Sequence, residues 1–308
     1  MMKMNGEILG LGSLIMDISI QCDRLPKPGE TVYTLASYNV NPGGKGGNQA
    51  VAAARSGGRV RLIGRITEDD YGKKLLCAYE KENIVTESLI RDDSSSTGVC
   101  FVWVDSTGTN ECLCSLGVNA KVTPADIMAF EPYFEEGTIV MTTLEYEPEI
   151  LELVTKTAKE KGCFVVVDPS SKDYSKLTED IAKRIDVLKP NEVETEILTG
   201  VRVETLEDAK RAVAILRERG ISIPIVSLGE RGAVYGYEGE IYEVEGIKVK
   251  AVDTTAAGDT FIGSLCAKLS KGEDIHSAVS YANRAAAYCV TRPGAYIYLV
   301  LSDAICRF

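Results

Sequence analysis

An acid stands inside a run of small residues at Asp253–Phe261, DTTAAGDTF, where a long helical pattern begins. The amides of Ala256, Ala257 and Gly258 fall in the first predicted turn, where N–H groups lack a helical partner and attract anions. A carboxylate there repels an anion unless it has a task, and Asp259 is suited to take a proton from a hydroxyl that attacks a phosphate. The alternative is structural, because Asp and Thr are common N-caps and small residues permit close packing.

A second unusual run is Asn41–Ala50, NPGGKGGNQA. Four glycines in five positions give a backbone that can wrap a small polar ligand, and Asn48 and Gln49 offer amides to sugar hydroxyls. The alternative is a flexible loop with a helix cap, which is weaker because so many glycines are costly to order. The run is not a P-loop, and the dinucleotide fingerprint is incomplete at Gly10–Gly12, so a dehydrogenase is not expected.

The composition excludes several classes of protein. The chain has 308 residues, 45% hydrophobic and 26% charged, which is typical of a globular protein. A net charge of −11 without a Lys/Arg block argues against nucleic-acid binding, and no apolar run reaches the length of a membrane span. No signal-peptide layout is recognised, and nine scattered cysteines indicate reduced thiols in the cytoplasm. The single histidine, His276, argues against zinc and Ser-His-Asp chemistry.

Strands that alternate with helices predict βαβ units and a mainly parallel sheet, with ligands at the carboxyl ends of the strands. Examples are the predicted strands Glu7–Gly12, Val60–Ile66 and Ile223–Ser227 and the predicted helix Asn48–Ser56. Predicted strands without helices break this rhythm at Ile18–Val40 and Gly98–Leu116, within segments at about 17–42 and 97–117, and Asp105–Gly108 is a predicted hairpin turn. We expect a single domain over 1–308 with these two segments forming a β lid, whose outer face could pair with a second copy or form an ordinary edge.

The two motifs together resemble the signatures of the ribokinase family, the PfkB-type carbohydrate kinases. GGKGGNQAVAAARSGG precedes DTTAAGDTFIG in the family's order, and the resemblance runs from about Gly10 to Gly294. It includes the segments PKPGET, STGV, KPNEVE, SLGERGA and TRPGA. The resemblance implies a three-layer α/β sandwich with a lid, ATP as phosphoryl donor, Mg²⁺, a K⁺ site, a sugar acceptor and a homodimer through the lid. NQAVAAAR and AAGD favour D-ribose, which would give D-ribose 5-phosphate.

The resemblance also implies a role for each matching residue. Asp259 would be the general base, and the amides of Ala256, Ala257 and Gly258 would form an anion hole. The implied sugar contacts are Asp17, Gly44, Lys45, Gly46, Gly47, Asn48 and Glu145. The implied nucleotide contacts are Asn191, Ser227, Gly229, Gly232, Gly258 and Asn283. Glu194 would organise Mg²⁺ through water, and the implied monovalent-cation site comprises Asp253, Thr255, Cys289, Arg292 and Gly294.

Structural alternatives and departures from the family pattern stand beside these roles. Asn191 could simply be an N-cap, and Glu145 an acid before a helix that opens at Pro148. Ile15 stands where ribokinases commonly have Asn, which loosens the preference for ribose. Tyr298 follows TRPGA where a small polar residue is usual, which bears on the cation site. A kinase for another sugar or a nucleoside therefore stays open, as does a non-catalytic binding protein, which the intact Asp259 disfavours.

Overall fold

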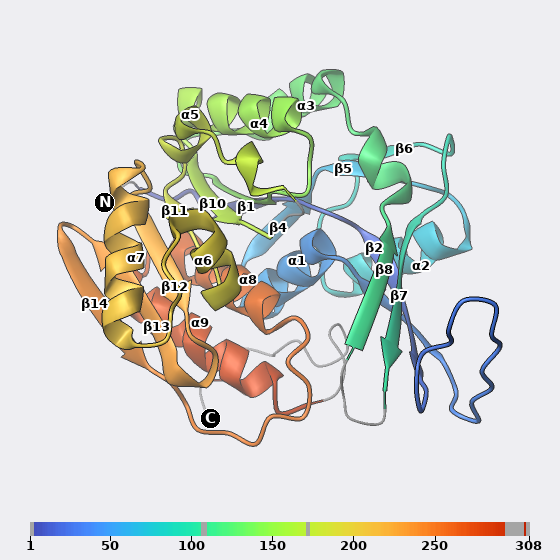
Figure 1. The fold of residues 1–308 in the computed structure, drawn as a ribbon. Coiled ribbons are helices and arrows are strands. Elements are labelled where there is room, and N and C mark those ends of the chain that lie inside the picture. Colours follow the sequence, from blue (N-terminus) through green and yellow to red (C-terminus); the bar gives the residue numbers. More distant parts are fainter. Residues whose placement is uncertain (1–2, 106–109, 171–172, 293–304, 306–308) are drawn as a thin grey trace.

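The computed structural model describes residues 3–105, 110–170, 173–292 and 305 (Figure 1). Their main sheet has eight strands in the order β14-β13-β12-β11-β10-β9-β1-β4. The strands from β4 to β12 run parallel, and β13 and β14 form an antiparallel hairpin at one edge. The prediction of a mainly parallel sheet is therefore confirmed. The strands are β1 Glu7–Leu11, β4 Arg59–Leu62, β9 Ile139–Thr143, β10 Phe164–Asp168, β11 Val187–Leu188, β12 Ile223–Ser227, β13 Gly232–Tyr237 and β14 Glu240–Glu245.

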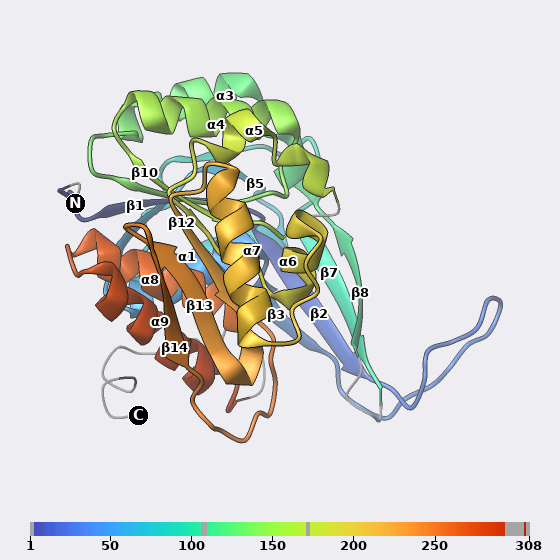
Figure 2. The ribbon, with the colours of Figure 1, turned by 60° about the vertical axis from the view of Figure 1, so that its left-hand side comes forward.

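Helices cover both faces of this sheet, and Figure 2 shows α8 and α9 on one side and α7 on the other. Strand residues point alternately to the two sides, so Ile8 joins one buried cluster and Leu9 the other. None of the described helices is long and apolar enough to cross a bilayer. One layer comprises α1 Lys45–Arg55, α8 Ala257–Ser270 and α9 Ile275–Cys289; the other comprises α3 Pro124–Phe130, α4 Pro148–Glu160, α5 Glu179–Ala182, α6 Glu192–Thr199 and α7 Leu206–Glu218.

Small residues let α1 and α8 approach at backbone distance. A Cβ atom on Gly263 of α8 would lie 2.7 Å from the Cβ of Ala52 and from the backbone N of Ala53. At the start of α1, a Cβ on Gly46 would lie 2.5 Å from the carbonyl carbon of Gly12. The glycine-rich run is thus packed against the end of β1, and α1 begins at Lys45, three residues before the predicted Asn48.

The predicted strand Val60–Ile66 is instead two strands in different sheets. β4 ends at Leu62, and β5, Gly64–Ile66, pairs with β6, Leu89–Arg91. Gly64 has a φ of +143°, a conformation that residues with a side chain rarely adopt, and the chain leaves the main sheet there.

The lid is a second sheet of four strands in the order β3-β2-β7-β8, seen at the right of Figure 1 with α2, Asp70–Lys81, beside it. Its strands are β2 Ile15–Gln21, β3 Asn39–Gly43, β7 Gly98–Val104 and β8 Asn110–Ser115. The expectation that strands fill Ile18–Val40 is wrong, because residues 22–38 contain no strand. Pro26 and Pro28 have no N–H to donate to a ladder. Residues 106–108 of the predicted hairpin turn lie outside the described residues.

Candidate active site

The two sequence motifs meet at a buried carboxylate. Asp259 lies in the first turn of α8, where its Oδ2 accepts a hydrogen bond from Asn48 Nδ2 at 3.2 Å and its Oδ1 accepts one from Gln49 Nε2 at 3.0 Å. Burial raises the pKa of Asp259 and the charge of Asp168 adds to this, while Lys45 and the two amides oppose it. A carboxylate held in place with a raised pKa has the properties of a general base.

Asp168, at the end of β10, extends this hydrogen-bonded arrangement and was not identified from the sequence. Gln49 Nε2 also donates to Asp168 Oδ2 at 3.2 Å, so one amide joins two carboxylates. Asp168 Oδ1 accepts from the Ser170 N–H at 3.0 Å, and Ser170 Oγ donates to Glu194 Oε1 at 3.0 Å. A chain of hydrogen bonds therefore links Asp259 to Glu194. The available signal was an acid directly after a buried strand, at the carboxyl edge.

Asn191 and Glu194 form a capping box at the start of α6. Asn191 Oδ1 accepts from the Glu194 N–H, and Glu194 Oε2 accepts from the Asn191 N–H, both at 2.9 Å. Asn191 is therefore the N-cap of α6, as the structural alternative predicted, and this role leaves a contact with the nucleotide as a prediction. Both oxygens of Glu194 already accept hydrogen bonds, and this favours contact with a metal through water over direct ligation. The carboxylate oxygens of Glu194 and Asp168 are the hard oxygen donors that Mg²⁺ prefers.

Asp17 and Lys45 bring opposite charges to the lid side of this centre. The Asp17 carboxyl occupies the space where a side chain on Gly43 would lie. Burial, with a further contribution from the Asp259 charge, raises the pKa of Asp17 to about 6. For Lys45, burial lowers the pKa, but the charges of Asp259, Asp168 and neighbouring acids outweigh it and raise the pKa overall. Lys45 therefore stays protonated and offsets part of the negative charge.

Two candidates for the sugar site, Asn48 and Glu145, differ in how many hydrogen bonds their side-chain oxygens accept. Among the described residues, Asn48 Oδ1 is buried without a hydrogen-bond partner, and such an atom is suited to accept from a ligand hydroxyl. The Glu145 carboxylate accepts from the Ser13 N–H at 3.2 Å, Ser13 Oγ at 3.1 Å and Thr143 Oγ1 at 3.0 Å. The N-cap position of α4 is Glu147, so Glu145 is not the cap of that helix. Ser13 also joins the loop, because its carbonyl accepts from the Gly47 N–H.

The start of α8 differs from a side-chain-capped helix. Its N-cap is Ala256, in a left-handed conformation at φ +60°, with no side-chain hydrogen bond to the helix. The structural alternative of an Asp or Thr cap is therefore wrong, since Asp253 accepts from the Thr255 N–H at 2.9 Å. The Ala257 N–H points to the Thr254 carbonyl at 3.3 Å, so this amide is already engaged. A left-handed alanine is uncommon and costs strain, which is often held at functional sites.

Four of the six predicted nucleotide residues lie along neighbouring strand ends, while Gly258 lies in the first turn of α8 and Asn283 lies on α9. Ser227 N–H and Oγ donate to the Pro190 carbonyl at 3.0 and 3.3 Å, which brings the end of β12 beside Asn191. Gly229 and Gly232 follow with φ values of +55° and +95°. Asn283 is buried on α9, where its Nδ2 donates to the Glu245 carbonyl of β14 at 3.0 Å. That amide group is thus partly committed to holding α9 against the edge hairpin.

The predicted cation site is only partly described. The N–H groups of Val252 and Asp253 donate to the Val290 carbonyl at 2.7 and 3.2 Å, and Cys289 Sγ lies 3.9 Å from the Thr255 carbonyl oxygen. The Arg292 N–H donates to the Cys289 carbonyl at 3.2 Å, so these residues are neighbours. Gly294 and Tyr298 lie outside the described residues. Within the described chain, no group of three or more His, Cys, Asp or Glu residues could hold a metal ion.

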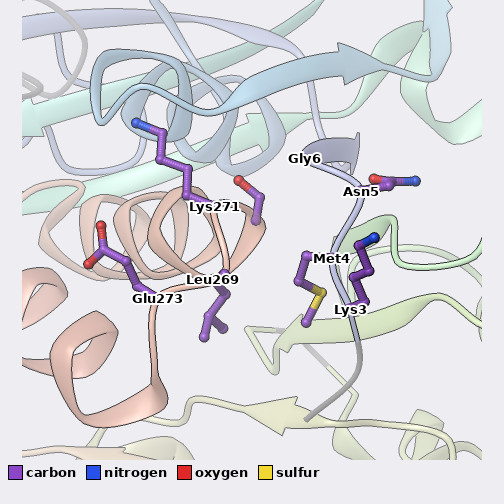
Figure 3. A pocket seen from close by; sticks show the side chains of 9 residues that line it. Lys3, Met4, Asn5, Gly6, Leu269, Lys271 and Glu273 are labelled. Atoms are coloured by element: carbon purple, nitrogen blue, oxygen red, sulfur yellow. The ribbon is translucent and has the colours of Figure 1, made fainter.

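A cavity of about 510 Å³ lies elsewhere, between residues 3–6 and 269–273 (Figure 3). It is at the far end of α8, and the helical rise places Ser270 about 16 Å from Asp259 along the axis. The cavity therefore has no part in the carboxylate site.

A buried carboxylate at a helix N-terminus, facing a cluster of hydrogen-bonding groups at the carboxyl edge of a three-layer α/β sandwich, is the arrangement that a phosphotransferase requires. Comparison with known proteins agrees, because residues 6–300 match the pfkB family carbohydrate kinases. The chain belongs to this family. It is therefore an enzyme that transfers a phosphoryl group to a sugar hydroxyl, and the family resemblance recognised in the sequence is confirmed.

Individual relatives match over nearly the whole chain. A ribokinase of Haemophilus influenzae is 34% identical, with 92% of each chain covered. A deoxyribokinase of Salmonella typhi is 30% identical, with 94% of each covered. The structure of Arabidopsis thaliana ribokinase complexed with ribose and ATP is similar with a TM-score of 0.88 and 28% identity, covering 99% of this chain and 98% of that one. The ribokinase-like fold is thereby confirmed as well.

Proposed function

We propose that this protein is a ribokinase, which transfers the terminal phosphoryl group of ATP to D-ribose and yields D-ribose 5-phosphate and ADP. The observation that carries the proposal is the pair of hydrogen bonds from Asn48 and Gln49 to Asp259. These hydrogen bonds connect the glycine-rich segment, which is suited to binding a sugar, to Asp259 at the start of α8, where a phosphate would bind. The similarity to the Haemophilus influenzae ribokinase, and to the Arabidopsis structure that contains ribose and ATP, supports this choice.

In the proposed reaction, Asp259 accepts the proton of the sugar hydroxyl. The hydroxyl oxygen forms a bond to the terminal phosphorus, and the bond from that phosphorus to the bridging oxygen breaks, so ADP leaves with the electron pair. Asp17, Lys45, Asn48 and Glu145 hold the sugar, with the buried Asn48 Oδ1 accepting from one hydroxyl. The amides of Ala256 and Gly258 at the start of α8 would face the charge on the phosphoryl group.

The proposal includes Mg²⁺ and a monovalent cation. Asp168 and Glu194 carry the oxygens that would hold Mg²⁺ through water, and the ion would neutralise phosphate charge. Carbonyl groups of the loop at 253–255 and of the end of α9 would hold K⁺, and this loop runs directly into α8. An ion there would help to fix the backbone that contacts the phosphoryl group.

Ile15 favours a second candidate, a kinase for a sugar with one hydroxyl fewer. Its side chain is buried, and a Cβ on Gly44 would lie 2.9 Å from Ile15 Cγ1. Since Ile15 and Asp17 are two apart on β2, they share one face of the lid, so an apolar group stands beside a predicted sugar ligand. The 30% identity to a Salmonella typhi deoxyribokinase supports this alternative.

A screen of ATP consumption separates the candidates. The purified protein is assayed with ribose, 2-deoxyribose, fructose, other pentoses and nucleosides, each with Mg²⁺ and with or without K⁺. The ribokinase proposal expects the highest kcat/KM with ribose, and a higher value with 2-deoxyribose selects the alternative. Turnover of a nucleoside alone would overturn both.

We also propose a cytoplasmic homodimer formed through the lid. On one face of the lid sheet, Phe101 and Leu113 lie opposite each other with exposures of 40% and 63%, and Trp103 stacks near Phe101. The loop between β2 and β3 adds Tyr33, 91% exposed. Exposed apolar side chains gathered on one face are typical of an interface, and a second copy has the same face to offer. The described cysteines are free thiols, which suits a reducing compartment.

A further inference from the structure

Lys189 is a buried cation to which no sequence motif gave a role. It follows β11 directly, its side chain is only 4% exposed, and its backbone N–H donates to the Val167 carbonyl at 3.2 Å. Its Nζ atom lies 3.0 Å from the position that a Cβ on Gly258 would occupy. The ammonium group is thus aimed at the first turn of α8, next to the amides of the proposed anion hole.

Lys189 is buried as a residue, but its Nζ atom is not among the fully buried, unpaired polar atoms of the described residues, so the ammonium tip is accessible to a ligand. Across the part of the chain that the structure describes, no ion pair or hydrogen bond engages Lys189 Nζ. Lysines are almost never buried unless they are paired, because an uncompensated charge inside a protein is costly. An anionic ligand that binds at the start of α8 would supply the missing partner.

The charge of the surrounding site makes such a cation necessary. The charges of four carboxylates raise the pKa of Lys45, namely those of Asp259, Asp168, Glu145 and Glu194. The charge of Asp259 also raises the pKa of Asp17. A nucleoside triphosphate adds further negative charge to this acidic region. The start of α8 offers only the equivalent of about half a positive charge. A full positive charge beside it would offset repulsion from the base at the point where the phosphoryl group passes.

We propose that Lys189 is a catalytic residue, whose ammonium group binds an equatorial oxygen of the phosphoryl group during its transfer from ATP to the sugar. The inference rests on the proposed function. Lys189 exchanges no proton, because it stabilises charge while Asp259 takes the hydroxyl proton. It also gives Gly258 a specific reason to be glycine, since a side chain there would press against the ammonium group.

The test compares K189M and K189R with K210M, a control on α7 that removes a lysine whose exposed ion pairs join Glu207 and Glu243. We expect K189M to lower kcat/KM for ATP about 100-fold or more, in line with the loss of one donor to a developing charge, while the KM for the sugar changes less than about threefold. K189R restores part of the rate, and K210M behaves as wild type.

Two further measurements exclude a merely structural role. Without nucleotide, K189M has a melting temperature equal to or above that of wild type, because methionine fills the space of the buried stem and the charge it removes pairs with no described protein group. By calorimetry its affinity for the non-hydrolysable analogue AMP-PNP falls at least about tenfold, and its affinity for ADP falls less, since ADP lacks the terminal phosphoryl group.

The proposal is overturned if K189M keeps kcat/KM for ATP within about threefold of wild type, or if its melting temperature and activity fall together. If K189M does not fold, G258A decides, because a methyl group there displaces the ammonium and is expected to lower AMP-PNP affinity more than ADP affinity. Equal losses of both affinities refute the proposal. A wild-type protein that phosphorylates no pentose would refute the ribokinase proposal alone, since the AMP-PNP and ADP measurements need no sugar.

Discussion

Replacing Asp259 by Asn is the sharpest test of the catalytic arrangement. The carboxylate accepts hydrogen bonds from both Asn48 and Gln49, so an amide in its place turns one of its two acceptors into a donor. One hydrogen bond is lost, at a cost of about 1–3 kcal/mol, while the removal of a buried charge acts in the opposite direction. We therefore expect D259N to fold with a nearly unchanged melting temperature.

The rate should change far more than the stability. A general base contributes about 10²- to 10⁴-fold, which corresponds to roughly 3–5 kcal/mol of transition-state stabilisation. D259N should therefore lose at least about 100-fold in kcat, measured by coupled detection of ADP, while sugar affinity measured by calorimetry stays within about tenfold. D180N, on the exposed start of α5, is the matched control. A D259N variant with kcat within tenfold of wild type would refute the assignment of the base.

Three further predictions concern the lid. I15N should lower the KM for ribose and raise the preference for ribose over 2-deoxyribose, and an unchanged ribose KM in steady-state assays would mean that Ile15 does not face the sugar. The folded protein holds the Asp17 proton up to about pH 6, against an ordinary pKa of 3.8, so wild type should lose stability relative to D17N as pH rises from 4 to 6. Melting curves across this range check the sign, and parallel curves contradict it. L113D should shift a dimer to monomers in sedimentation velocity, because it places a charge on an exposed apolar face.

The sequence predicted those elements whose patterns are determined locally. β12, Ile223–Ser227, has the predicted bounds because a strand buried on both faces is a continuous apolar run. The break at Ile63 was missed, since apolar residues continue across it and only the backbone turn at Gly64 separates the two strands. The hairpin of β13 and β14 was not predicted either, although Glu238 and Gly239 supply two left-handed residues at its turn.

The same division applies to the site. Asp259, Asn48 and Asp17 stand in motifs, so their types and spacing were enough to select them. Asp168 and Lys189 each follow a short strand as single charged residues. Lys189 begins the segment KPNEVE and Asp168 follows a buried strand, but neither local pattern gives the residue a role. Their significance comes from neighbours distant in the chain, namely Gln49 for Asp168 and Gly258 for Lys189. Only the folded arrangement of β10, β11, α1 and α8 reveals these contacts.

The tight contact between α1 and α8 at Gly263 has an evolutionary consequence. Because the two backbones touch there, a substitution that adds even one methyl group must push the helices apart. Gln49 lies on α1 and Asp259 lies on α8, so a shift of either helix would move these two side chains relative to each other. Such a change would misalign both the proposed base and the side of the substrate site that α1 forms. The lid side chains that face the predicted sugar site, such as Ile15 on β2, are not part of this helix junction. Selection for a new acceptor should therefore accumulate changes on β2 and β7 while leaving the junction of α1 and α8 untouched.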